Sequence, residues 1–148
     1  MKKPYYIALM MLVGNLAFAQ QYKVVTIVES ILPAGLGRSR IIESKGSADV
    51  NALTTQRDGK ISKQSDVDRD EVKESGENMK ETKLVNFYSL VGINFGNIAS
   101  NDAVISAKIN SLAAEGWSVA FVSSACESDA GKDDGKGIFI TRIFFVKK

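Results

Sequence analysis

The sequence predicts an α+β protein, in which a two-layer arrangement packs one amphipathic helix on one face of an antiparallel sheet of four to five strands. Three features lead to this fold class: segments with a period of two near both ends of the chain, one segment with helical period, and a polar middle. A lone helix has one apolar stripe to bury, and an antiparallel sheet offers an apolar face to receive it. The expected order is β-β-(insertion)-β-α-β-β, formed by residues 20–148 as a single domain.

Residues 1–19 have the pattern of a secretory signal peptide. Lys2 and Lys3 are followed by an apolar run from Tyr5 to Phe18, and Ala17-Phe18-Ala19 supplies the small residues of a cleavage site. The apolar run is shorter than the roughly 20 residues that cross a bilayer. We therefore expect cleavage after Ala19 and a mature protein in the bacterial periplasm or secreted, without stable membrane insertion.

Removal of this leader changes the net charge. The whole chain carries 19 basic and 17 acidic residues, so loss of Lys2 and Lys3 leaves 17 of each. A neutral chain has no global attraction for nucleic acid or for anionic lipid. We therefore expect no nucleic-acid partner.

Residues 21–44 are expected to form two strands. In QYKVVTIVESI the side chains from Tyr22 to Glu29 alternate between two faces, and LPAGLG interrupts the pattern before RSRIIES resumes it. Alternation with period two and β-branched enrichment are typical of a half-buried strand. The segment is therefore predicted to be a hairpin or a wide β-arch.

The stretch GLGRSR within this segment resembles a loop that cradles phosphate. Such a loop leads into a helix N-terminus, whereas this one leads into a predicted strand. We therefore interpret Gly35 and Gly37 as turn glycines. Arg38 and Arg40 are two apart on an extended segment, so they are candidates for binding a carboxylate or a sulfated glycan from one side; simple solvation near Glu43 is the alternative.

Residues 45–83 are predicted to be a polar, charged loop or insertion that holds no core. More than half of the residues from Arg57 to Lys83 are charged. Such a segment buries too little apolar surface to offset the entropy lost on ordering. We expect at most transient helix, near residues 70–80.

One metal pattern lies in this insertion, in the stretch DVDRDEVKESGE. Glu71 stands where the sharp turn of a calcium loop needs glycine, and Lys73 stands where an apolar residue is usual. A weak Ca²⁺ site and a solvated charge run both remain open. The candidate ligands occupy positions 1, 3, 5 and 12 of the loop spacing and are Asp66, Asp68, Asp70 and Glu77.

Residues 84–117 are predicted to form a strand and then the helix. In LVNFYSLVGINF the apolar residues from Val85 to Phe95 recur with period two. Capping residues follow at Ser100, Asn101 and Asp102. Gly116 is placed to end the helix in the left-handed conformation. The apolar stripe of the helix consists of Ile105, Ile109, Leu112 and Ala113.

Two final strands, WSVAFVSSAC and GIFITRIFFVKK, flank a turn rich in aspartate and glycine. The only cysteine, Cys126, lies at the end of the first of them. We interpret it as a small buried residue of the strand. An intermolecular disulfide or a reactive thiol is the alternative.

The residues around the end of the predicted helix, together with the first and last strands, resemble a group of known proteins. The chain opens with a YKVV strand, Tyr22 to Val25. The helix ends in a Leu-x-x-x-Gly-Trp pattern, formed by Leu112 and Gly116-Trp117, and the closing strand, residues 144–148, ends in lysine. In these features the chain resembles small uncharacterised exported bacterial proteins. The resemblance implies the fold and brings no activity with it. We expect Trp117 to cover the seam between helix and sheet.

The residues that are absent exclude several activities. The chain has no histidine and one cysteine, which excludes Ser-His-Asp and Cys-His catalysis and the histidine- and cysteine-rich zinc sites. We expect a non-enzymatic binding or interaction module of the envelope, with an envelope protein or a surface polymer as its partner. A carboxylate-dependent hydrolase of an envelope polysaccharide that uses Glu29 or Glu43 is the rival. A third expectation is self-association through an exposed sheet edge.

Overall fold

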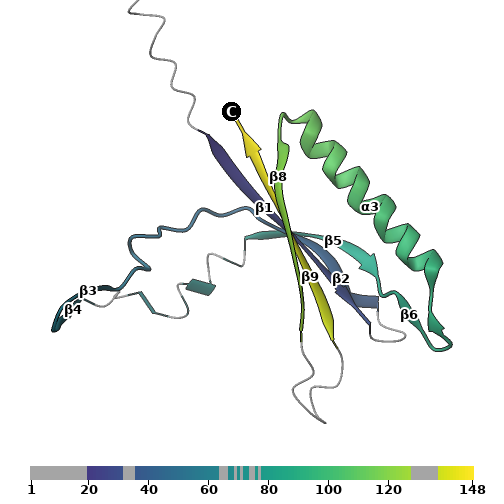
Figure 1. Ribbon diagram of the computed structural model, residues 1–148, viewed down its shortest axis with the longest axis horizontal. Helices are drawn as coiled ribbons and strands as arrows, with labels where there is room; N and C mark the ends of the chain where they lie inside the picture. The colour runs from purple at the N-terminus through teal and green to yellow at the C-terminus, as the bar shows by residue number, and fades with distance from the viewer. Residues whose placement is uncertain are drawn as a thin grey trace, which may run out of the picture.

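The computed structural model describes residues 20–31, 36–63, 67–68, 70, 72–73, 76, 78–127 and 137–148. They form a five-stranded sheet with one long helix on one face (Figure 1), which confirms the α+β prediction. The predicted signal peptide, residues 1–19, lies outside the described residues. Among the described residues, no helix is both long and apolar enough to cross a membrane.

The strand order of the main sheet is β5-β2-β1-β9-β8, and every neighbouring pair is antiparallel. The first and last strands of the fold occupy its centre, because β1 and β9 pair from Gln21↔Lys147 to Ser30↔Ile138. The strands are β1 (Gln21–Ser30), β2 (Leu36–Ser44), β5 (Met79–Val85), β8 (Ser118–Cys126) and β9 (Ile138–Lys147).

The predicted insertion contains a small hairpin and the start of a sheet strand. β3 (Gln56–Asp58) and β4 (Ile61–Lys63) pair around Gly59, whose φ of 54° suits glycine, and the hairpin lies away from the main sheet (Figure 1). None of the described residues of the insertion belongs to the buried apolar core. The boundary at residue 83 was wrong, because β5 begins at Met79 and pairs along β2.

The strand predicted over residues 84–95 ends at Val85. A two-strand hairpin, β6 (Tyr88–Ser89) and β7 (Gly92–Ile93), follows it, and Gly92 has a φ of 117°. Val91 is 98 % exposed, so the alternation of apolar residues here does not mark a buried face.

Helix α3 (Phe95–Ala114) also begins earlier than predicted. Its N-cap is Asn94, whose side-chain oxygen accepts a hydrogen bond from the backbone N–H of Asn97 at 3.2 Å. The predicted capping group at Ser100, Asn101 and Asp102 therefore lies inside the helix, where Asn101 is fully buried.

The C-terminal end of α3 is as predicted. Gly116 has a φ of 88° and its N–H donates to the carbonyl of Ala113, while the N–H of Trp117 donates to the carbonyl of Leu112. These two bonds form a Schellman motif. Trp117 packs against the core, and the ammonium groups of Lys23 and Lys147 lie 4.8 and 5.9 Å from its ring centroid. The same Lys147 donates to the carbonyl of Glu115 at 2.7 Å and so satisfies the helix end.

The core lies between α3 and the middle of the sheet. Ile105, Ile109 and Leu112 of the predicted stripe face it, whereas Ala113 is exposed and Val104 packs there instead. The fully buried apolar residues come from β1, β2, β5, β9 and α3 and are Val25, Ile27, Ile41, Leu84, Leu112, Ile143 and Phe145.

Strand β8 contributes no residue to this core. All of its residues are exposed, including Val119, Phe121 and Val122. Cys126 is exposed as well, so its prediction as a buried residue was wrong. The reason is the sheet order, which places β8 at one edge of the sheet. The sheet face away from α3 also carries apolar side chains, among them Val24 of β1 and Phe121, whose ring contacts Phe144.

Gly116→Ala should lower the free energy of unfolding by about 1–2 kcal/mol, because a left-handed conformation is unfavourable for a residue with a Cβ. The added Cβ would also meet the Cε of Lys147 at 3.4 Å. Urea denaturation measures the effect. The control is Gly76→Ala, where a Cβ meets nothing within 4 Å; equal stability of the two variants would contradict this account of the helix end.

Candidate functional site

A cleft of about 470 Å³ opens on the helix side of the sheet, between the first half of α3 and the strands β8 and β9. α3 contacts the sheet mainly at β5, whereas every residue of β8, at the other edge, is exposed, so the cleft lies on the side of the sheet that the helix does not cover. Its lining residues come from β1, the segment after β5, α3, β8 and β9, and are Glu29, Phe87, Ile98, Ser124, Ala125, Cys126, Phe139 and Thr141.

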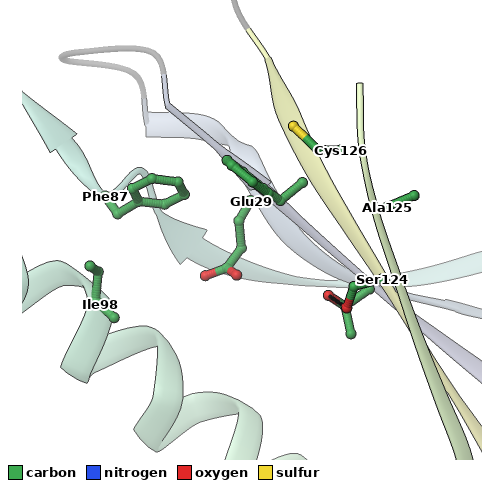
Figure 2. A pocket seen from close by; sticks show the side chains of 8 residues that line it. Glu29, Phe87, Ile98, Ser124, Ala125 and Cys126 are labelled. Carbon is green, nitrogen blue, oxygen red and sulfur yellow. Dashed lines mark hydrogen bonds between the residues drawn. The ribbon is translucent and has the colours of Figure 1, made fainter. Parts of the chain in front are cut away.

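The walls of the cleft are mainly apolar. The rings of Phe87 and Phe139 lie 5.8 Å apart between centroids, with a tilt of 50°. Figure 2 shows Phe87 on one side of the cleft and Ile98 below it on α3, while Ala125 points away. Phe139 is 41 % exposed, so part of this residue is accessible to a ligand.

Glu29 supplies the charge of the cleft. Its carboxylate points from β1 toward the space between α3 and Ser124 (Figure 2). One carboxylate oxygen accepts a hydrogen bond from the side-chain amide of Asn101 at 3.1 Å. Among the described residues Glu29 takes part in no ion pair. The carboxylate is therefore held in place by a neutral donor and keeps its negative charge available to a ligand.

Asn101 is the residue that fixes this arrangement. Its side chain also donates to the carbonyl of Val85 at 2.8 Å and accepts from the N–H of Val85 at 3.0 Å, as a neighbouring strand would. The amide is 1 % exposed and has its donors and acceptor occupied. Buried amides that are satisfied in this way specify one side-chain orientation. Asn101 thus joins α3, the end of β5 and Glu29.

A second polar cluster supports the end of the sheet next to the cleft. The hydroxyl of Ser39 donates to the side-chain oxygen of Asn86 at 2.7 Å and accepts from the N–H of Ser30 at 2.9 Å. Asn97 of α3 donates to the carbonyl of Asn86 at 2.7 Å. These bonds fix the chain just before Phe87, and therefore the position of the aromatic wall.

Three further polar groups line the cleft, from Ser124, Thr141 and Cys126. The hydroxyls of Ser124 and Thr141 are hydrogen-bonded to each other at 2.8 Å across β8 and β9. The thiol of Cys126 donates to the carbonyl of Glu127 at 3.4 Å and remains exposed. The cleft therefore combines an aromatic wall, one carboxylate, a hydroxyl pair and a thiol.

The two glutamates of the predicted hydrolase lie apart. Glu43 pairs with Val25 in the sheet register, four residues before Glu29 on β1, which corresponds to about 13 Å along the strand. Glycosidase carboxyl groups are about 5–9.5 Å apart. Glu43 is also 8 % exposed and forms an ion pair with Lys108 of α3. The structure therefore gives the cleft one carboxylate and assigns Glu43 to the contact between helix and sheet.

Arg38 and Arg40 both lie on β2, which pairs with β1, and neither residue is among those that line the cleft. Arg40 donates to both carboxylate oxygens of Glu81 at 2.9 Å, so its charge is already paired. Arg38 is exposed. The burial of β2 alternates, because Ser39 and Ile41 are buried whereas Arg38 is exposed and Arg40 is half-buried. The register of β2 with β5 is irregular between Leu36 and Arg40. Gly37 lies in β2 rather than in a turn, and Gly35 is outside the described residues.

Two of the four candidate calcium ligands, Asp66 and Glu77, lie outside the described residues. Asp68 and Asp70 are exposed, and Asp70 accepts a hydrogen bond from the ammonium of Lys73 at 2.9 Å. Within the described part of the chain, no group of three or more acidic, cysteine or histidine side chains is arranged to hold a metal.

The asparagines that organise the site were missed by reasoning from the sequence. Asn97 and Asn101 lie four residues apart on α3, and Asn101 is four residues before Ile105. Polar side chains that continue an apolar stripe with helical spacing are a signal for buried polar contacts. The signal was masked because Asn101 stands next to two other good capping residues.

Lys108→Met should lower the free energy of unfolding by about 3 kcal/mol, since it leaves the buried carboxylate of Glu43 without a partner. Thermal and urea denaturation measure it. The double variant Glu43→Leu with Lys108→Met should recover most of the loss, because removal of both charges leaves none unpaired. An unchanged free energy of unfolding in the Lys108→Met variant would contradict a structural role for Glu43.

Comparison with known proteins adds no assignment to this geometry. No family model matches the chain, and no curated protein or solved structure matches it. The resemblance to exported bacterial proteins therefore stays a prediction, and the function has to be argued from the cleft.

Proposed function

We propose that the protein is a non-enzymatic binding module of the bacterial envelope, which holds a group of an envelope protein or surface polymer in the cleft beside β8. The observation that carries this proposal is the carboxylate of Glu29, which is hydrogen-bonded to Asn101 in a cleft with aromatic walls. Ligand sites typically combine apolar walls with a few fixed polar groups.

The cleft chemistry indicates the kind of group that it would take. Phe87, Phe139 and Ile98 suit an apolar or flat ring surface. Glu29 suits a cation or a strong hydrogen-bond donor, and the Ser124–Thr141 hydroxyls suit further polar atoms. A basic side chain with an apolar stem or an amino sugar fulfils these requirements. The proposal therefore predicts recognition that depends on the Glu29 charge.

The hydrolase remains the rival, and two observations weigh against it. A second carboxylate at catalytic distance from Glu29 is absent from the described lining of the cleft, and Glu43 is occupied by Lys108. The rival requires that Glu29→Gln or Glu43→Gln abolish hydrolysis of an envelope polysaccharide while the protein stays folded. The binding proposal expects no hydrolysis by the wild-type protein.

Cys126 provides a direct test because it is the only cysteine of the chain and lines the cleft. A maleimide reagent should label it several times more slowly in intact cells than in the purified protein, since a bound partner covers the cleft. Mass spectrometry of the recovered protein measures the labelled fraction. The matched control is Cys126→Ser with Asn51→Cys, which places the thiol in an exposed turn and should label at equal rates. Equal rates at Cys126 as well would count against the proposal.

Glu29→Gln separates recognition from folding. Glutamine keeps an oxygen that can accept from Asn101 but removes the charge, so the melting temperature should change little. Protection of Cys126 in cells should be lost. Persistent protection in this variant would show that the partner does not depend on the carboxylate.

The calcium alternative makes its own prediction. Because Asp70 is paired with Lys73, we expect a solvated charge run, and the melting temperature should be the same with calcium and with a chelator. A clear rise with calcium would instead establish a metal site in residues 66–77.

A further inference from the structure

β8 has an unprotected edge. It pairs with β9 on one side, and its other side pairs with no strand among the described residues. Its sequence, SVAFVSSAC, contains no charged residue and no proline, and every residue of it is exposed. Natural proteins usually protect such edges with charges, proline or a covering element, since free N–H and C=O groups accept another strand.

The opposite edge of the same sheet is protected. β5 carries Lys80, Glu81 and Lys83, and the side chain of Asn101 occupies the N–H and C=O of Val85 at its end. The contrast between the two edges identifies β8 as the one suited to strand pairing.

We propose that β8 pairs antiparallel with β8 of a second copy of this chain, which joins the two five-stranded sheets into one continuous sheet. An antiparallel strand pair can be related by a two-fold axis, so one interface satisfies both copies and closes the assembly. The regular part of β8, from Phe121 to Cys126, is the segment that pairs, because the register is irregular between Val119 and Phe121.

Charge favours a second copy as the occupant. When Phe121 to Cys126 of each copy pairs antiparallel with the same segment of the other, Glu127 lies opposite Ala120, so its charge meets a neutral residue. The strand itself carries no charge, so no like charges meet across the axis.

Sedimentation equilibrium on the purified protein tests this inference. The wild-type protein should have twice the mass of one chain at micromolar concentration. Val122→Lys should have the mass of one chain, because lysine in the middle of an edge strand opposes pairing. Val91→Lys, at a site that is 98 % exposed and far from β8 in the sequence, should remain a dimer.

Val24→Lys distinguishes the edge from the sheet face opposite α3, since Val24 lies on that face. It should leave the dimer intact. A wild-type monomer at all concentrations, or a dimer that Val24→Lys abolishes and Val122→Lys does not, would overturn the inference.

If Val122→Lys fails to fold, hydrogen exchange of the wild-type protein tests whether β8 forms the interface. Dilution of the wild-type protein should accelerate exchange of β8 amides and leave those of β5 unchanged; equal behaviour of the two strands would overturn the inference. The labelling rate of Cys126 in cells tests the proposed function and not the dimer. If Cys126 stays protected from the maleimide reagent in cells when Val122→Lys has made the protein monomeric, the protection comes from a partner other than a second copy.

Discussion

The fixing of α3 at its two ends is the constraint from which the rest of the structure follows. At the C-terminal end, the Schellman motif at Gly116 turns the chain so that Trp117 packs on the core. Near the N-terminal end, the amide of Asn101 bonds to both backbone groups of Val85 and to Glu29. Between these points the helix lies over the β5, β2 and β1 side of the sheet. A single helix placed there cannot also cover β8, so the cleft and the open edge have a common origin.

The same constraint gives the two strand glutamates different roles. Glu43 lies under the helix, where Lys108 neutralises it and the pair belongs to the interior. Glu29 lies nearer to the first half of α3, where the helix offers a neutral amide rather than a cation. A buried ion pair requires a complementary partner, whereas a hydrogen-bonded carboxylate at a cleft can still receive one. The difference in environment, rather than in residue type, makes Glu29 the candidate recognition group.

Local patterns predicted the features that depend on neighbours in the chain. The alternation in β1, the spacing of Ile105, Ile109 and Leu112, and the stop at Gly116 all follow from backbone geometry and appear in the structure. The start of α3 was not predicted, because Ser100 and Asp102 offered a cap as good as Asn94. The exposure of Cys126 could not be predicted at all, since it depends on which strand ends at the sheet edge, and strand order is set by contacts between distant segments. The residues of the cleft were predicted only in part for the same reason. Glu29 was a candidate because it lies on a predicted strand, whereas Asn101 and Phe87 are brought next to it by tertiary packing.

Native-state hydrogen exchange of the backbone amides tests most directly whether helix and sheet form one unit. Each buries its apolar surface only against the other, so the slowest amides of α3, β1 and β9 should all exchange with the free energy of global unfolding. If the amides of α3 exchange at a clearly lower free energy while β1 and β9 stay protected, the helix detaches on its own. It would then not fix the position of Glu29, and the account would be contradicted.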